Sequence, residues 1–275
     1  MRPHGVLPAD NHVHSEWSWD THSASMRESC ARAVELGVPA VAFTEHVDFR
    51  RWGDADGRPG VQVSPGYRAA LAPLDVEGYF ASVEECRAKF PDLRVVAGVE
   101  AGEPHLFPGS LEDVLRRGAF ERVLGSLHAV VEDGLLVGAD SLWRVDPDNL
   151  MRRYLAELLN LVETSSAFEV LAHADFPRRN WPAHRPFDEG AFEAEYRAVF
   201  RALAVDGRVL ELNTRSPMWS ETLVGWWREE GGRALSFGSD AHTPHRVGAR
   251  FVTAVDVAGA AGFGPGRDAY DFWRC

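Results

Sequence analysis

Short apolar runs alternate with longer segments of amphipathic pattern along most of the chain. Seven runs predict β-strands at 6–14, 40–46, 94–100, 122–129, 169–173, 208–214 and 234–240. The segments between them predict helices at 25–36, 76–90, 111–117, 147–164, 189–205 and 221–230. Gly37 follows the first of these helices as a C-cap, and Pro91 ends the second. Strands that are separated by helical crossovers indicate an α/β fold with a mostly parallel sheet.

Seven such strands in one chain, separated by helices, favour a closed or nearly closed barrel over a long open sheet. The chain has 275 residues, of which 45% are hydrophobic, and this suffices for one large core, so residues 1–275 are predicted to form a single domain. Segments 50–73 and 131–147 are rich in Gly, Asp and Pro and are predicted to be long loops over the catalytic face. The tail 258–275 is Gly-rich and then aromatic, and we expect it to pack back on the barrel.

Composition argues against several classes of protein. A net charge of −12 disfavours nucleic acid as the main partner, but it is compatible with a small phosphorylated substrate because bound metal ions reverse the local field. No apolar run approaches the roughly 18 residues of a membrane span, and the first residues do not resemble a signal peptide. The cysteines Cys30, Cys86 and Cys275 form no disulfide or zinc-knuckle pattern, which predicts a cytoplasmic protein with no membrane partner. The sequence does not indicate an oligomeric state.

Six of the eleven histidines fall at or just beyond the carboxyl end of a predicted strand: His12, His14, His46, His128, His173 and His242. Active sites of parallel α/β barrels form at that end. Side chains two apart on a strand point the same way, so His12 and His14 can hold one metal ion, as can Asp240 and His242. Glu100 ends another strand, and Asp20 follows the first pair, with His22 as a nearby alternative.

Imidazole and carboxylate ligands without a cysteine cluster suit Zn²⁺, Mn²⁺ or Fe²⁺. Nine candidate ligands exceed what one tetrahedral ion needs, so two or three divalent ions are implied. Closely spaced ions can generate hydroxide at neutral pH and stabilise both the attacking and the leaving oxygen. The remaining histidines, His4, His105, His184 and His245, lie outside the pattern, and surface or core positions are expected for them.

The order of these motifs resembles the PHP (polymerase and histidinol phosphatase) family of phosphoesterases, over most of the chain, and within it the histidinol-phosphate phosphatase branch. The motifs are His12-x-His14-x5-Asp20, Thr44-Glu45-His46, Gly98-Val99-Glu100, Gly125-Ser126-Leu127-His128, His173-x-Asp175-x2-Arg178, Glu211-Leu212-Asn213-Thr214 and Gly238-Ser239-Asp240-Ala241-His242. The resemblance implies a distorted seven-stranded (β/α)7 TIM-like barrel. It also implies hydrolysis of a small phosphate monoester by a metal-bridging hydroxide, with L-histidinol phosphate, an intermediate of histidine biosynthesis, as the favoured substrate.

The resemblance further implies a trinuclear ligand set. In that set His12, His14, Glu100 and Asp240 hold the first ion. Glu100 bridges to a second ion, which His128 and His173 also bind, while Asp20, His46 and His242 hold the third.

Arginines that follow the strands are candidates for phosphate contact, because the guanidinium group can bond two phosphate oxygens at once. Arg178 and Arg215 follow the fifth and sixth predicted strands, and Arg179 and Arg246 are further candidates. His245 lies close to the Asp240–His242 motif and is a candidate to protonate a leaving alkoxide.

Four alternatives stay open from the sequence. Arg215 fits the pattern of the branch, but the following Ser216-Pro217-Met218-Trp219 departs from it, which leaves room for another phosphorylated metabolite or a nucleotide as substrate. A nuclease or proofreading domain and a barrel without catalysis are the second and third alternatives. The fourth is an amidohydrolase-type barrel, but the only lysine, Lys89, lies on a predicted helix, and this argues against the version with a carboxylated lysine.

Overall fold

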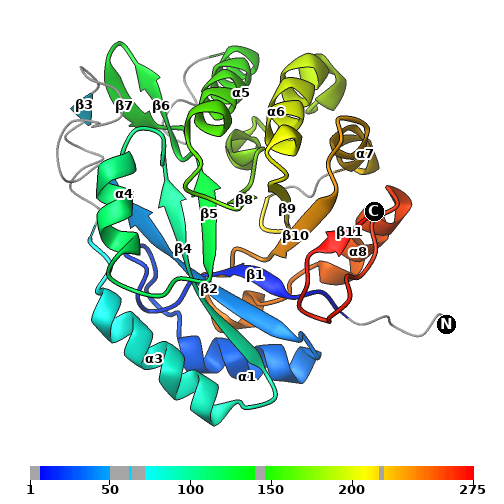
Figure 1. Ribbon diagram of the computed structural model, residues 1–275. Helices are drawn as coiled ribbons and strands as arrows, with labels where there is room; N and C mark the ends of the chain where they lie inside the picture. The colour runs from blue at the N-terminus through cyan, green and yellow to red at the C-terminus, as the bar shows by residue number, and fades with distance from the viewer. Residues whose placement is uncertain (1–6, 50–61, 64–71, 140–145, 217–219) are drawn as a thin grey trace.

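The centre of the molecule is a curled sheet of eight strands (Figure 1). The computed structural model describes residues 7–49, 62–63, 72–139, 146–216 and 220–275. The strands of the sheet, in spatial order, are β1 (Asp10–Val13), β2 (Ala40–Asp48), β4 (Arg94–Gly102), β5 (Arg122–Ser126), β8 (Val170–Leu171), β9 (Val209–Asn213), β10 (Ala234–Gly238) and β11 (Trp273–Arg274). The strands from β1 to β10 are all parallel to their neighbours, whereas β11 pairs antiparallel with β10.

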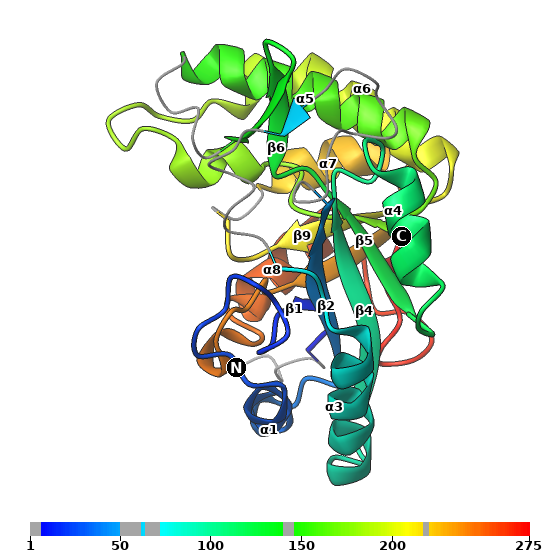
Figure 2. The ribbon, with the colours of Figure 1, turned by 90° about the vertical axis from the view of Figure 1, so that its left-hand side faces the viewer.

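Helices lie around the outside of this sheet. They are α1 (Met26–Leu36), α3 (Val76–Lys89), α4 (Pro108–Leu115), α5 (Pro147–Thr164), α6 (Glu193–Val205), α7 (Glu221–Glu229) and α8 (Phe251–Ala260). The helices α5, α6 and α7 lie on one side of the molecule and α1 and α3 on the opposite side (Figures 1 and 2). Local signals set the ends of α1: the Ser25 hydroxyl accepts a hydrogen bond from the amide of Glu28, and Gly37 ends the helix at a φ of 74°.

The first and last parallel strands meet at their carboxyl ends. The amide of His14 donates to the carbonyl of Ala241 at 2.9 Å, and the amide of Asp240 donates to the carbonyl of His12 at 2.7 Å. Asp240 has a φ of 51°, a left-handed conformation that aspartate tolerates better than most residues. The chain therefore turns sharply after β10, and this turn brings the end of β10 against the end of β1.

Two clusters of buried apolar side chains pack the helices onto the sheet. One lies beneath α5 to α8, and the other beneath α1, α3 and α4. Tyr79 of α3 links the second cluster to two strands, because its hydroxyl donates to the carbonyl of Phe43 and accepts from the amide of Gly98, each at 2.7 Å. The apolar clusters hold the strands in place, and the buried polar side chains gather at the carboxyl ends of the strands.

The main departures from the predicted elements lie outside the parallel strands. Segment 131–147, predicted to be a loop, contributes to a hairpin of β6 (Ala129–Glu132) and β7 (Leu135–Gly138), and β7 also pairs with β3 (Gln62–Val63). The short apolar runs on both sides of the turn dipeptide Asp133-Gly134 carry this hairpin signal. Most of segment 50–73 lies outside the described residues.

The carboxyl-terminal part of the chain also differs from expectation. Helix α8 was not predicted, because its residues Val252, Thr253, Val255 and Val257 are β-branched. The tail packs back on the curled sheet and adds β11, which is why the sheet has eight strands and not seven. Among the described helices, none is both long and apolar enough to cross a membrane.

Candidate metal centre

The carboxyl ends of the strands bring histidines and carboxylates from six parts of the chain into one buried cluster. Its members form overlapping groups whose ligand atoms lie within 4.8 Å of one another, a spacing that can hold metal ions. The groups are His12–His14–Glu100, His12–His173–Asp240, His46–Glu100–His128 and His14–His46–His242. These groups contain eight of the nine ligands predicted from the sequence, namely the six histidines, Glu100 and Asp240.

Glu100 occupies the middle of the cluster and is 1% exposed. Its Oε1 atom lies 2.6 Å from Nε2 of His173 and 3.1 Å from Nε2 of His128. Its Oε2 atom lies 3.0 Å from Nδ1 of His46 and 3.3 Å from Nε2 of His12. One carboxylate therefore contacts imidazoles from β1, from β2 and from the segments that directly follow β5 and β8.

Asp20, and not His22, completes the outer side of the cluster. The Oδ2 atom of Asp20 lies 2.8 Å from Nε2 of His242 and 3.4 Å from Nε2 of His46. His22 is exposed to solvent. Asp240 lies between this side and the centre, with Oδ1 at 3.5 Å from Nε2 of His14.

The residues present fit divalent cations. Oε2 of Glu100, Nδ1 of His46 and Oδ1 of Asp20 are buried and have no hydrogen-bond partner among the described residues, although Oε2 of Glu100 and Nδ1 of His46 are only 3.0 Å apart. Leaving buried polar atoms without partners is costly, and each of them is a donor atom that Zn²⁺, Mn²⁺ or Fe²⁺ accepts.

The pKa shifts within the cluster also indicate that its carboxylates attract positive charge. Burial opposes the charge of His128, yet the attraction of Glu100 and Asp48 raises its pKa to about 9. Burial would raise the pKa of Glu100, but His12, His128 and His46 hold that pKa well below its usual range. His14 behaves in the opposite way, because burial and the neighbouring imidazoles of His46 and His242 lower its pKa.

These shifts predict that metal binding releases protons. A metal ion binds the deprotonated imidazole, whereas His128 in the metal-free protein is protonated below about pH 9. The apparent affinity for Zn²⁺ is therefore expected to rise with pH between about 6 and 9, with at least one proton released per chain at pH 7. Calorimetric titration in buffers of different ionisation enthalpy measures this number. A binding enthalpy that does not depend on the buffer would contradict the prediction.

A second layer of polar residues supports the histidines, and the sequence analysis assigned no role to it. Glu211 accepts hydrogen bonds from Nδ1 of His12 and from the amide of His173, each at 2.7 Å. Asp48 lies 3.6 Å from Nδ1 of His128 and accepts from the indole of Trp19. Glu45 belongs to the motif Thr44-Glu45-His46, and Glu211 to the motif Glu211-Leu212-Asn213-Thr214. An acidic residue within such a motif was the available signal in the sequence.

The two arginines after β8 have different surroundings. Arg179 faces the cluster: its Nη2 lies 2.5 Å from Oδ2 of Asp240, and its Nε donates to the hydroxyl of Ser216. The guanidinium group of Arg178 instead pairs with Glu189 at 3.3 Å. Of these two candidates, Arg179 therefore contacts the cluster and Arg178 does not. The cause is η3 (Phe176–Asn180), a 3-10 helix in which adjacent side chains diverge.

A cavity of about 310 Å³ opens beside the cluster and is bordered by Asp240 and His242. Arg215 lines it, and its Nη1 lies 2.9 Å from Oδ1 of Asp240. Arg246 and Arg250 line the same cavity. His245 is exposed on η5 (Pro244–Arg246) and is not among the residues that border this cavity, so its expected role as a general acid finds no support in its position.

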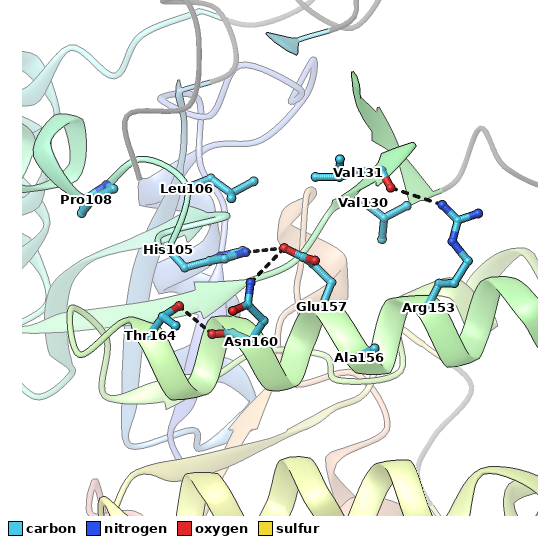
Figure 3. A pocket seen from close by; sticks show the side chains of 10 residues that line it. All are labelled: His105, Leu106, Pro108, Val130, Val131, Arg153, Ala156, Glu157, Asn160 and Thr164. Atoms are coloured by element: carbon cyan, nitrogen blue, oxygen red, sulfur yellow. Dashed lines mark hydrogen bonds and ion pairs between the residues drawn. The ribbon is translucent and has the colours of Figure 1, made fainter. Parts of the chain in front are cut away.

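His105 lies outside the cluster, as its position in the sequence indicated. It lines a separate pocket of about 670 Å³ between α5 and the segment before α4 (Figure 3). Its Nε2 lies 2.8 Å from Oε1 of Glu157, which Asn160 also contacts. His184 is exposed, and His4 lies outside the described residues.

Comparisons with known proteins agree with this geometry. The family model of the PHP domain matches residues 10–215, which is most of the chain, so the chain belongs to the PHP domain family. Among its relatives, the histidinol-phosphatase of Lactococcus lactis is 25% identical over 266 residues, covering 92% of this chain and 91% of the relative. A protein described as a probable histidinol-phosphatase from Deinococcus radiodurans is 28% identical over 269 residues, covering 91% and 94%.

A solved structure shares the fold. It is the histidinol phosphate phosphatase of Lactococcus lactis in complex with zinc, L-histidinol and phosphate. The TM-score is 0.79 at 22% identity, and the match covers 94% of this chain and 95% of that one.

Proposed function

We propose that this protein is a metal-dependent phosphatase that hydrolyses L-histidinol phosphate to L-histidinol and inorganic phosphate. The observation that carries the proposal is the convergence of nine imidazole and carboxylate side chains on one buried cluster at the carboxyl ends of the strands. The relatives named above support the substrate, because two of them are described as histidinol-phosphatases and span nearly all of this chain.

The proposed ligand set for two or three divalent ions follows the contacts within the cluster. His12, His14, Glu100 and Asp240 would hold one ion, and Glu100, His128 and His173 a second. Asp20, His46 and His242 would hold a third. When bound, such ions supply a nucleophilic water at neutral pH and neutralise the charge of the phosphoryl oxygens. We further propose that the parallel strands form a distorted (β/α)7 barrel and that residues 1–275 are one domain.

The protein groups around the cluster bind and orient the ester. Ser216, Asn213 and Asp240 hold the guanidinium group of Arg179. A guanidinium group fixed in this way can hold a phosphoryl group without losing further side-chain freedom. Arg215 borders the adjoining cavity and is 44% exposed, so it can meet the phosphate as the ester enters.

A second candidate function keeps the same chemistry with another substrate. Arg215, Arg246 and Arg250 all line the cavity beside the cluster, and this charge would also suit a phosphate ester with a second anionic group.

A substrate panel separates the two candidates. Metal-loaded protein is supplied with L-histidinol phosphate, a sugar phosphate, a bisphosphate and a nucleotide, and kcat/KM is measured for each. We expect L-histidinol phosphate to be preferred by at least about 10²-fold, since a site built for a substrate's polar groups rejects analogues that lack them. Preference for the bisphosphate would contradict the proposed substrate and support the second candidate function.

A further inference from the structure

A chain of buried hydrogen bonds lies beneath His14, on the side of the ring that faces away from the cluster. Ser18, in the segment after β1, is 3% exposed. Its hydroxyl oxygen lies 3.0 Å from Nδ1 of His14 and 2.6 Å from Oε2 of Glu45. The amide of His46 also donates to this oxygen, at 3.1 Å.

Glu45 is surrounded by hydrogen-bond donors. The amide of Ser15 donates to both of its oxygens, at 3.2 and 3.0 Å, and the hydroxyls of Ser15 and Ser18 each donate to one oxygen at 2.6 Å. Hydroxyl contacts as short as these are typical of an ionised carboxylate.

The hydrogen atoms in this chain can be counted. A serine hydroxyl has one hydrogen, and the hydrogen of Ser18 is directed to Glu45. The oxygen of Ser18 must then accept from His14, so Nδ1 of His14 carries a hydrogen. The lone pair of Nε2 then faces the cluster, where this atom lies 3.1 Å from Nε2 of His12 and 3.5 Å from both Oε2 of Glu100 and Oδ1 of Asp240.

We propose that Ser18, held by Glu45, is a positioning residue that fixes the tautomer and the orientation of His14 so that Nε2 is presented to a divalent cation. The proposal deepens the metal centre of the proposed function and is independent of which phosphate ester is hydrolysed. It also assigns a role to Glu45 of the Thr44-Glu45-His46 motif, which the ligand set leaves unused.

Zinc affinity provides the first test. The dissociation constant is measured at pH 8 by competition with a chromophoric chelator for the wild type, Ser18→Ala, Ser18→Thr and Glu45→Gln. Loss of a hydrogen-bond partner of a metal-binding histidine typically weakens metal affinity about 10- to 100-fold, and we expect this for Ser18→Ala and Glu45→Gln. Ser18→Thr retains the hydroxyl and should bind within about threefold of the wild type.

Ser29→Ala is the matched control. Ser29 is a buried serine of α1 whose hydroxyl has no hydrogen-bond partner in the part of the chain that the structure describes, so its removal should leave zinc affinity unchanged. The melting temperature of each metal-free variant shows whether it folds. Equal zinc affinity of Ser18→Ala, Glu45→Gln and Ser29→Ala would overturn the proposal.

The histidine tautomer provides the second test and needs no metal. Long-range ¹H–¹⁵N spectra of metal-free protein at pH 8 are expected to show His14 with its hydrogen on Nδ1, and Ser18→Ala should lose this preference. A wild-type His14 with its hydrogen on Nε2 would overturn the proposal even if no zinc bound. If the wild type binds zinc as predicted but does not hydrolyse L-histidinol phosphate, the proposed function fails and the positioning role stands.

Discussion

Glu100→Gln is expected to lower the zinc content of the purified protein and to reduce kcat/KM for L-histidinol phosphate by about 10³-fold or more. Glutamine has nearly the same shape, but it removes the charge that lies within 3.3 Å of four histidines. A bound metal ion commonly contributes several kcal/mol of transition-state stabilisation, and about 4 kcal/mol corresponds to a factor of about 10³. Elemental analysis and steady-state kinetics on the same preparation measure both effects.

Glu157→Gln is the control for this substitution. Glu157 is also a largely buried carboxylate that contacts a histidine, but it lies in the separate pocket beside His105. Its substitution should leave the metal content and kcat/KM close to those of the wild type. Normal metal content and normal turnover in Glu100→Gln would show that Glu100 does not bridge ions.

Arg179→Ala is expected to reduce kcat/KM by about 10²-fold while the metal content stays near the wild-type value. A hydrogen bond to a charged group contributes about 1.5–3 kcal/mol, and a phosphoryl group would lose at least one such bond. Loss of Arg179 also removes a cation that pairs with Asp240 at 2.5 Å. Because the guanidinium group is not a metal ligand, kcat/KM should fall in this variant while the metal content does not.

Arg178→Ala tests the same prediction from the neighbouring residue. The guanidinium group of Arg178 pairs with Glu189 and lies over the ring of Phe187, 4.5 Å from its centroid. Its removal is expected to lower stability by about 1 kcal/mol and to change kcat/KM less than about threefold. A larger kinetic effect from Arg178→Ala than from Arg179→Ala would reverse this assignment and restore the assignment made from the sequence.

The cluster could be predicted because its residues follow a rule of topology. Side chains that end parallel strands meet at one edge of the sheet wherever the strands lie in the sequence. His12, Glu100 and Asp240 are far apart along the chain, yet each lies within two residues of the carboxyl end of a strand, so their meeting required only the order of the strands. The hydrophobic pattern supplied that order.

The residues that the sequence could not place depend on local geometry within one or two positions. Arg178 and Arg179 are adjacent in a 3-10 helix, and only its rotation decides which one faces Asp240. His245 lies three residues beyond His242, but the intervening turn exposes it to solvent. Likewise, only the path of the segment after β1 decides that Asp20, and not His22, contacts the cluster.

The supporting carboxylates were missed for a different reason. Glu45 and Glu211 lie beside predicted ligands in the sequence, but a buried carboxylate can serve as a ligand, as a structural hydrogen-bond acceptor or as an ion-pair partner. The hydrogen bonds of Glu211 to His12 and His173, and of Glu45 to Ser15 and Ser18, distinguish these roles, and these contacts join distant segments.

Metal-dependent hydrolysis is tested by measuring phosphate release from L-histidinol phosphate while metal-free protein is titrated with Zn²⁺. Because Glu100 contacts histidines on both sides of the cluster, turnover is expected to require occupancy of adjoining positions. We expect no turnover in chelator, and activity that rises with added Zn²⁺ and saturates at two or three ions per chain. Turnover that persists in excess chelator, or its absence once the ions are bound, would contradict this expectation.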